Sequence, residues 1–485
     1  MTLAVVLSCV FWAFGANAQS PLGDSLTSAF AKPPHRRTRA SACVIDLATG
    51  STVFSLQTDL PLVPASAMKV ITMAVALSEL GPDFQFKTTL ATNGRDLIAI
   101  GDGDPALGDE RLHRRRNETI TSDFDRWADT LLGHGITTIS GDLVLDESIF
   151  DDVRLHPSWE ADDLDNWYAA PVGALNFNDN CIDMTVRPGA SKGAPAFVSY
   201  LPANGLLNIV NQCRTGGKGN PTLHHAYDSF EYRITGGCKK KWKFGPVSFP
   251  DPGLLFGASL EAALASKGIT LKGKTVRKRV RNPDGNLPRT FDSIGHRTTP
   301  IRDVLHRAGK DSQNLFAECL LKRAGYSWAK RVGRDDPQGS WTLGAQSVSE
   351  LFEWADIDRK GLRVSDGSGL SRENLCTTRQ LAALLAWTHR RPEGRVMYDS
   401  LAIAAEDGSM RRRLKDLPGR VRAKTGTMTG ICALAGYVDG QQGPRFAFAV
   451  IFNGYKGPST PYRKIQDKLC RILAAEASAP ALGSR

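Results

Sequence analysis

The sequence predicts a mixed α/β (α+β) fold, in which an antiparallel sheet packed with helices is interrupted by a β-rich insertion. Three observations support this prediction. With 485 residues, the chain is too long for one ordinary core, and two or three domains are expected. Helix and strand patterns occupy both ends, whereas residues 188–245 are glycine-rich and polar. A hairpin near the N-terminus cannot form a stable sheet alone, so we expect it to pair with C-terminal strands.

The N-terminal part is predicted to contain a lead-in, a hairpin and a buried helix. Residues 21–39 are polar and contain prolines, so we expect an extended segment. Apolar runs at 43–47 and 52–56 flank a short glycine-containing turn, which is typical of a hairpin. Residues 66–80 follow Pro64 and are apolar on nearly every side, and such a helix is normally buried.

The remaining elements form a β-rich middle and a mixed end. Short strands and glycine turns are expected over 87–178, with an alternating strand at 137–148. Helices are predicted at 254–266, 299–306, 315–324 and 377–388. Strands at 420–423, 432–438 and 446–452 precede a final amphipathic helix at 462–475.

Composition indicates a globular protein, with 41% hydrophobic and 23% charged residues and a net charge of +11. The basic runs 114–116, 239–241 and 411–413 are short and scattered, so solvated surface is the simpler interpretation. A nucleic-acid partner would need basic residues interleaved with aromatics, and no such patch is evident. A basic surface would suit an acidic polymer.

The first residues predict export. Residues 3–14 are apolar but too few to span a bilayer comfortably. Ala16-Asn17-Ala18 follows, with small residues at the spacing that signal peptidase requires, although the usual positive n-region is missing. We expect a signal peptide over 1–18, no transmembrane anchor, and a soluble exported chain.

Eight cysteines remain after this cleavage. An even number in an exported protein permits disulfides. One bridge is expected where three of them crowd together, and buried free thiols are the alternative for the rest. Their spacing matches no zinc pattern, so we expect no metal. The crowded residues are Cys181, Cys213 and Cys238.

Three short motifs carry the chemistry. Ser66-Ala67-Met68-Lys69 opens the buried helix, which places serine and lysine one turn apart on one face. This is a nucleophile beside a base that needs no histidine. Ser312-Gln313-Asn314 precedes a later helix, and Lys424-Thr425-Gly426 follows a strand. Each motif alone has a simpler explanation, a helix N-cap for either serine and a solvated strand end for Lys424. Three accidental matches in this order are much less expected than one active site.

The residue types fit cleavage of an amide or ester through an acyl-enzyme. This reaction needs an exposed hydroxyl group, a nearby base and an oxyanion hole. Ser66 would attack, and Lys69 would accept its proton if burial and the neighbouring cation Lys424 lower the lysine pKa. Ser312 would relay protons to the leaving amine, and Asn314 would hold the peptide amide of the substrate.

The third motif would bind the end of the substrate. Lys424 and Thr425 would face a carboxylate at the substrate's C-terminus. Gly426 would allow the backbone to approach closely, since it has no side chain. The main-chain N–H groups of Ser66 and Thr427 would form the oxyanion hole.

With these motifs the chain resembles the class C low-molecular-mass penicillin-binding proteins, the D-alanyl-D-alanine carboxypeptidases and endopeptidases of the penicillin-binding protein 4 type. The resemblance extends over nearly all of the mature chain. It includes Gly101-Asp102-Gly103-Asp104-Pro105, Gly141-Asp142-Leu143-Val144, Tyr168-Ala169-Ala170-Pro171, Asn178-Asp179-Asn180 and Asp366-Gly367-Ser368-Gly369-Leu370-Ser371-Arg372.

The resemblance implies a transpeptidase/β-lactamase-like domain with nested β-rich inserted domains, and it implies no cofactor. It divides the chain into a catalytic domain of residues 19–88 and 290–485, an inserted domain of 89–177 and 246–289, and a third domain of 178–245.

The resemblance also implies a periplasmic enzyme that removes the terminal D-Ala from peptidoglycan stem peptides and cleaves D-Ala–diaminopimelate cross-links. Penicillin would acylate Ser66. Asp163, Tyr168 and Arg372 fall where the family lines the pocket for the diaminopimelate side chain. A structural role is nearly as well supported for Asp163 and Tyr168.

Two other functions compete with this interpretation. A serine β-lactamase has the same three motifs, but the long insertion and residues 366–372 argue against it. A non-catalytic wall-binding or β-lactam-sensing module would be favoured by a damaged motif, and all three motifs are intact. Oligomeric state and the balance of carboxypeptidase and endopeptidase activity do not follow from the sequence.

Overall fold

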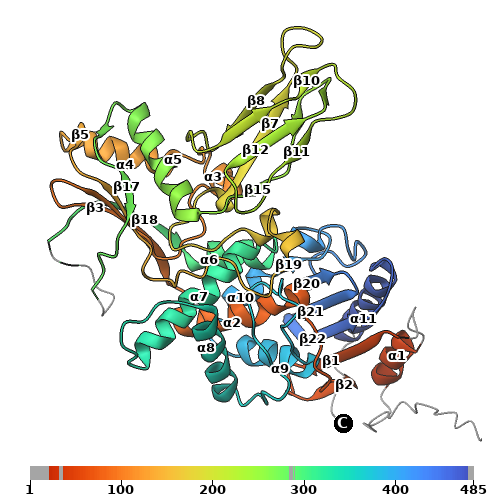
Figure 1. Cartoon of the computed structure of the whole chain (residues 1–485). Helices are drawn as coiled ribbons and strands as arrows, with labels where there is room; N and C mark the ends of the chain where they lie inside the picture. The colour runs from red at the N-terminus through yellow and green to blue at the C-terminus, as the bar shows by residue number, and fades with distance from the viewer. Residues whose placement is uncertain (1–20, 32–36, 283–287, 289, 479–485) are drawn as a thin grey trace, which may run out of the picture.

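The computed structural model describes residues 21–31, 37–282, 288 and 290–478, so the expected signal peptide at 1–18 lies outside the described residues. A six-stranded antiparallel sheet forms the main layer (Figure 1). The N-terminal hairpin joins the C-terminal strands as predicted, since Ala42 pairs with Val450. In spatial order the strands are β19 (Ala402–Ile403), β20 (Val421–Met428), β21 (Ile431–Gly440), β22 (Gly443–Asn453), β1 (Arg39–Asp46) and β2 (Thr52–Leu56).

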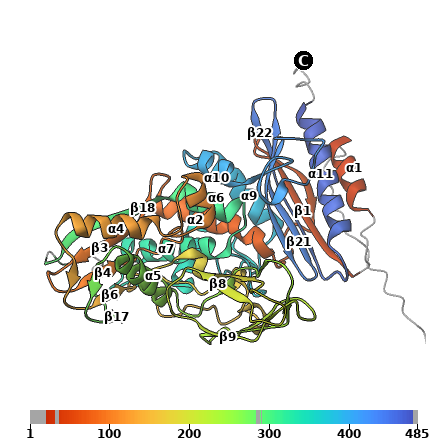
Figure 2. The same cartoon turned by 90° about the horizontal axis from the view of Figure 1, so that it is seen from above.

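Helices cover both faces of this sheet (Figure 2). On one face lie α1 (Pro21–Phe30) and α11 (Thr460–Ser478). The other face packs against a helical layer built around α2 (Lys69–Leu80), whose residues from Lys69 to Leu77 are all buried. The surrounding helices are α6 (Ile301–Gly309), α7 (Asn314–Arg331), α8 (Trp341–Trp354), α9 (Thr378–His389) and α10 (Gly394–Ser400).

The N-terminal lead-in is helical, so the prediction of an extended segment over 21–39 was wrong in its first half. Leu26, Ala29 and Phe30 share one face of α1 and are buried. The Phe30 ring stacks on Phe54 and Phe452, with centroids 5.7 and 6.0 Å apart. Tertiary packing therefore selects the helix, and Pro21 is tolerated because it stands at the first helical position.

The insertion begins and ends side by side, because β3 (Gln85–Thr92) pairs antiparallel with β18 (Asp292–Pro300). A second sheet continues from β3 through β4 (Leu97–Ile100) and β6 (Leu143–Asp146) to β17 (Thr275–Arg277). Its helices are α4 (Ser122–Gly133), which the sequence pattern did not reveal, and α5 (Pro252–Ser266). A short helix α3 (Glu110–Arg115) and a strand pair β5 (Thr138–Ile139) and β16 (Thr270–Leu271) complete this part.

The single strand predicted over 137–148 is two strands, β5 and β6, in different sheets. The chain turns between them at Gly141, where a Cβ atom would lie 2.0 Å from Asp96 Oδ1. Because the alternation of apolar and polar residues continues through this turn, periodicity alone does not reveal the break between the two strands.

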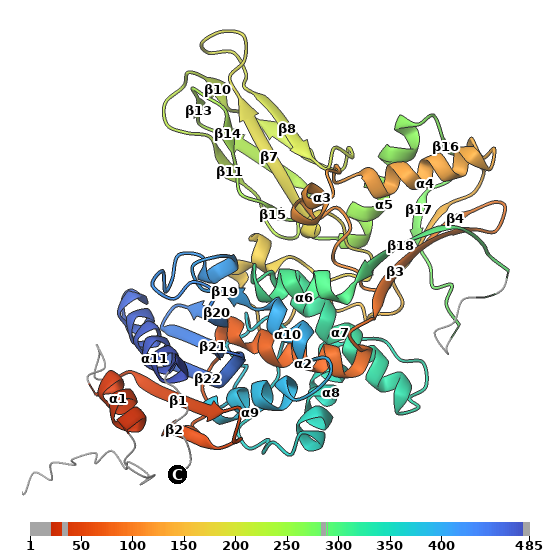
Figure 3. The ribbon, with the colours of Figure 1, turned by 180° about the vertical axis from the view of Figure 1, so that it is seen from behind.

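A third group of strands extends away from the rest of the molecule (Figure 3). Its elements are β7 (Cys181–Arg187), β8 (Phe197–Leu201), β9 (Asn208–Asn211), β10 (Arg214–Thr215), β11 (Thr222–His224), β12 (Glu231–Thr235), β13 (Gly237–Cys238), β14 (Trp242–Lys243) and β15 (Val247–Ser248). The expected bridge among Cys181, Cys213 and Cys238 is not formed, since all three thiols are free and buried. We propose that the three groups of elements correspond to the division into residues 19–88 with 290–485, 89–177 with 246–289, and 178–245. Strand β15 pairs with β7 of the third group although it lies just past residue 245.

Candidate active site

Ser66 stands at the start of the buried helix, within a 3-10 turn over Ala65–Met68 that continues directly into α2. The Lys69 ammonium group lies 3.1 Å from the Ser66 hydroxyl oxygen. It also donates to the Asn314 side-chain oxygen at 2.7 Å and to the Ser368 carbonyl oxygen at 2.8 Å. Lys69 is fully buried, whereas Ser66 keeps partial access to solvent.

The second motif lies between the other two. Ser312 adopts a left-handed backbone conformation with φ of 62°, which is uncommon for a residue other than glycine. Its hydroxyl group accepts a hydrogen bond of 2.8 Å from the Lys424 ammonium group. Asn314 opens α7, where its side-chain amide accepts from Lys69 and donates to the Tyr168 carbonyl oxygen at 2.7 Å.

The third motif forms part of β20, the strand beside the start of α2. Lys424 is fully buried, and Thr425 donates its hydroxyl hydrogen to Ser409 at 2.9 Å. At Gly426, a Cβ atom would lie 2.5 Å from the Pro64 carbonyl oxygen and 3.0 Å from the Ala67 nitrogen. Only glycine therefore lets the strand approach the serine turn so closely.

The two buried lysines have lowered pKa values. Burial lowers the pKa of Lys69 to about 7, while the carboxylates of Glu318 and Asp366 oppose this shift. Burial, followed by repulsion from Lys69, holds the pKa of Lys424 well below its usual range. Burial acts on Lys69 as we expected, and the repulsion between the two neighbouring cations disfavours the charged form of both lysines.

A buried carboxylate, which the motifs did not reveal, supports Lys69 from behind. Glu318 accepts hydrogen bonds from the backbone N–H groups of Gly367 and Ser368, both at 2.8 Å, and from the Trp341 indole at 2.7 Å. Burial raises the pKa of Glu318 to about 7. By holding Ser368, Glu318 fixes the carbonyl oxygen that binds Lys69. Glu318 lies one α-helical turn after Asn314, and this spacing was the available signal.

A second buried cluster supports the Ser312 turn. Arg307 donates two hydrogen bonds to Asp109, at 2.9 and 2.6 Å, and one of 2.8 Å to Asp311. Its guanidinium group also lies 3.5 Å from Asp179, which accepts 2.8 Å from the Gln313 side chain. Asp109 and Asp179 belong to the insertion, so the insertion directly contacts the second motif.

The three residues of the proposed diaminopimelate pocket are linked through Glu160. The Tyr168 hydroxyl group donates to Asp163 at 2.8 Å, and the Tyr168 carbonyl oxygen binds Asn314. Burial and Asp163 raise the pKa of Tyr168 to about 12. Arg372 is exposed and pairs with Glu160 at 2.8 Å. The Glu160 carbonyl oxygen accepts 2.9 Å from the Asp163 N–H, so Arg372 adjoins Asp163 through Glu160. Arg372 also donates 3.3 Å to the Thr429 carbonyl oxygen, just beyond β20.

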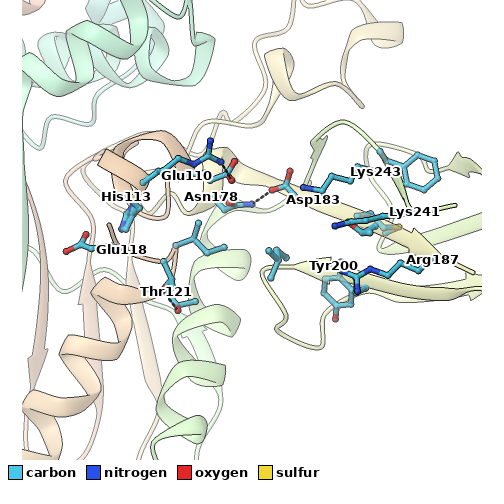
Figure 4. A pocket seen from close by; sticks show the side chains of 18 of the residues that line it. Glu110, His113, Glu118, Thr121, Asn178, Asp183, Arg187, Tyr200, Lys241 and Lys243 are labelled. Atoms are coloured by element: carbon cyan, nitrogen blue, oxygen red, sulfur yellow. Dashed lines mark hydrogen bonds and ion pairs between the residues drawn. The ribbon is translucent and has the colours of Figure 1, made fainter. Parts of the chain in front are cut away.

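A cavity of about 840 Å³ lies away from the three motifs (Figure 4). It opens between α3 and the outward faces of β7, β8 and β14, where Figure 4 shows Glu110 opposite Asp183 and Lys243. No residue predicted for the site lines it. The chemistry predicted from the motifs therefore belongs to the Ser66 region.

The described residues contain neither a membrane-spanning helix nor a cluster of potential metal ligands. Across residues 21–31, 37–282, 288 and 290–478, no helix combines the length and apolar character needed to cross a bilayer. Within those same ranges, histidine, cysteine, aspartate and glutamate side chains nowhere gather as three or more potential metal ligands.

Two known proteins of similar sequence are named as D-alanyl-D-alanine carboxypeptidases. A D-alanyl-D-alanine carboxypeptidase of Actinomadura sp. (strain R39) is 31% identical over 463 residues, which cover 89% of this chain and 80% of that protein. The D-alanyl-D-alanine carboxypeptidase DacB of Haemophilus influenzae is 26% identical over 404 residues, covering 81% of this chain and 80% of that protein.

The fold is shared with a solved structure. The crystal structure of penicillin-binding protein 4 (dacB) from Haemophilus influenzae superposes with a TM-score of 0.74 at 23% identity, covering 95% of this chain and all of that chain. This likeness confirms the predicted fold class. The model of the D-Ala-D-Ala carboxypeptidase 3 (S13) family matches residues 22–476. The resemblance inferred from the motifs is thereby confirmed, and the chain belongs to the D-Ala-D-Ala carboxypeptidase 3 (S13) family of serine DD-peptidases.

Proposed function

We propose that Ser66 is the nucleophile that releases the terminal D-Ala from peptidoglycan stem peptides and opens D-Ala–diaminopimelate cross-links. The observation that carries this proposal is the Lys69 amine, buried and 3.1 Å from the Ser66 hydroxyl oxygen. A lysine whose pKa is lowered to about 7 can act as a general base at neutral pH. Export to the periplasm, where the polymer lies, is part of the proposal.

The first step forms a bond between Ser66 Oγ and the substrate carbonyl carbon, while Lys69 takes the hydroxyl proton. The N–H groups of Ser66 and Thr427 stabilise the resulting oxyanion. The C–N bond then breaks, and the amine leaves with a proton passed through Ser312, which Lys424 holds at 2.8 Å. Water then attacks the ester carbonyl carbon. Its hydroxyl group stays on the released acid, and its other proton passes to Ser66 Oγ as the ester C–O bond breaks.

Substrate binding uses the strand and the start of α7. Lys424 and Thr425 bind the C-terminal carboxylate, and Gly426 lets β20 lie against the serine turn. Asn314 holds the peptide amide with the donor and acceptor capacity that its bonds to Lys69 and Tyr168 leave free. Asp163, Tyr168 and Arg372 receive the diaminopimelate side chain, whose amine and carboxylate match their charges.

Intact mass after brief exposure to benzylpenicillin tests the nucleophile. The wild-type chain should gain one stable penicilloyl group, since the lactam mimics the D-Ala-D-Ala amide, and Ser66→Ala should gain none. A relative of the same fold has been crystallised with a β-lactam, which makes this probe suitable. The same two proteins should then be compared on a stem pentapeptide, where only the wild-type chain should release D-Ala.

The two competing functions give different results in this experiment. Rapid drug turnover without an adduct would indicate a serine β-lactamase. No adduct, no turnover and no release of D-Ala would indicate a non-catalytic wall-binding or β-lactam-sensing module. In that last case, Ser66→Ala would also leave the cell-wall phenotype unchanged.

A further inference from the structure

An arginine-lined pocket of about 360 Å³ opens beside the third motif. One wall is β20, through Thr425 and Thr427. Four arginines form most of the remaining lining, and no acidic residue contributes to it. Three of these arginines belong to a basic run that the sequence alone indicated to be solvated surface. The arginines are Arg411, Arg412, Arg413 and Arg463.

Three of the four guanidinium groups are available to a ligand. Arg413 is held by Asp467, to which it donates at 2.6 Å, so its charge is already balanced. Arg411 and Arg412 are exposed, and over residues 290–478 and the other described ranges neither side chain has a hydrogen bond or ion pair. Arg463 donates to the Thr427 hydroxyl oxygen at 3.3 Å and has no carboxylate partner in the described part of the chain.

The loop that carries Arg411 and Arg412 is fixed relative to the active site. Its 3-10 turn (Gly408–Met410) is anchored by the Ser409 N–H, which donates 2.9 Å to the Lys310 carbonyl oxygen. The Ser409 hydroxyl group accepts from Thr425 at 2.9 Å. Gly408 has φ of 52°, and a Cβ atom there would lie 2.4 Å from the Lys310 carbonyl oxygen. The backbone that carries Arg411 and Arg412 is therefore held before a ligand binds, which reduces the entropy lost in ordering this loop.

The position of the pocket identifies the part of the substrate that reaches it. In the proposed function, the carboxylate next to the cleaved bond lies against Lys424 and Thr425. The pocket therefore lies on the side of the leaving group. A free D-Ala leaving group ends at that single carboxylate, so it would leave the outer arginines without a partner. In a cross-link, the leaving amine belongs to a second stem peptide, which bears further carboxylates. Guanidinium groups bind carboxylates with paired hydrogen bonds.

We propose that Arg411, Arg412 and Arg463 form a subsite for the carboxylates of this second stem peptide, and that the subsite favours cross-linked peptidoglycan over single stems. This proposal rests on the proposed function, because it places the cleaved bond at Ser66. The chemistry at the bond is the same for both substrates. The leaving amine of a cross-link departs with one proton, as the amine of D-Ala does.

The test compares two substrates with two variants. Arg411→Gln/Arg412→Gln should lower kcat/KM for a purified cross-linked muropeptide dimer about tenfold, since each lost surface charge contact is weak alone. Cleavage of an N-acylated tripeptide ending in D-Ala-D-Ala, and acylation by benzylpenicillin, should change less than about twofold. Arg114→Gln/Arg115→Gln removes the same charge from another exposed run and should leave kcat/KM for both substrates unchanged.

Amidation of the carboxylates on the second stem shows whether these groups are what the arginines bind. The wild-type chain should cleave the amidated dimer more slowly than the native dimer. The Arg411→Gln/Arg412→Gln variant should cleave the amidated dimer at the same rate as the wild-type chain does. The proposal is overturned if the variant cleaves the native dimer as well as the wild-type chain does. It is also overturned if both substrates are affected equally, or if the variant loses only binding to phosphatidylglycerol vesicles. Failure of the proposed function is distinct, because neither tripeptide cleavage nor penicillin acylation would then occur in the wild type.

Discussion

Lowering the pH should slow acylation of Ser66, because Lys69 must be neutral to accept a proton. The ammonium group is fully buried, and this burial lowers its pKa from 10.5 to about 7. In water the same lysine would be almost entirely charged at neutral pH. The buried environment thus sets the pH at which the enzyme becomes active.

The size of the effect follows from the pKa. About half of the Lys69 side chains are neutral at pH 7, about one tenth at pH 6 and about nine tenths at pH 8. The second-order rate constant for acylation by benzylpenicillin should therefore fall about tenfold per pH unit below the pKa and level off above it. Because Glu318 has a raised pKa in the same range, the observed midpoint belongs to the group of interacting charges.

The assay is stopped-flow acylation across the range from about pH 5 to about pH 9, with tryptophan fluorescence recorded to show that the fold persists. Lys267→Met is the control, since it also removes one lysine charge, but Lys267 pairs with Asp129 on α4 instead of binding Ser66. Its midpoint should equal that of the wild type. A rate constant that stays level between pH 6 and pH 8, or that rises on acidification, would refute the role of Lys69 as the base.

Four further substitutions test the supporting structure. Gly426→Ala should slow acylation at least about tenfold, because its Cβ atom would lie 2.5 Å from a backbone oxygen beside Ser66; stopped-flow acylation measures this. Arg307→Met should cost about 3–5 kcal/mol by leaving the buried Asp109 unpaired, and adding Asp109→Asn should recover part of the loss in thermal melting. Glu318→Gln should cost about 1–3 kcal/mol, since its amide would face donors, and acylation should slow. Tyr168→Phe should raise KM for diaminopimelate-containing peptides and spare acylation by penicillin, as steady-state kinetics would show.

The parts of the site that the sequence predicts are those set by local geometry. Ser66 and Lys69 meet because one helical turn separates them, and Asn314 opens a helix that the sequence predicted to begin at residue 315. The contact of Lys424 with Ser312 spans 112 positions, so the sequence could indicate only that the motifs occur in the right order. Glu318 was missed because its partners Trp341, Gly367 and Ser368 are distant in sequence, and its spacing of one helical turn from Asn314 does not by itself distinguish it from a solvated carboxylate.

The elements of the fold that were predicted correctly are likewise those fixed by local sequence patterns, whereas the N-terminal lead-in, which was predicted wrongly, depends on distant contacts. The hairpin 43–47 with 52–56 and the buried helix were predicted, since alternation and apolar patterns fix them locally. The helix over Pro21–Phe30 was predicted to be extended, because its few apolar residues form a face only when Phe54 and Phe452 provide a surface to cover. Tertiary contacts override a weak local preference in such segments.

The insertion contacts the second motif of the candidate active site. Ser312 holds a backbone conformation that an L-residue adopts only when its surroundings impose it. On one side Lys424 binds its hydroxyl group. On the other, the Gln313 N–H donates 3.1 Å to the Arg307 carbonyl oxygen, and the Gln313 side chain donates to Asp179. Since Asp179 comes from the insertion, the inserted part provides one of the contacts that keep the Ser312 turn in place. A chain lacking the insertion would retain all three motifs but lose a support of the second.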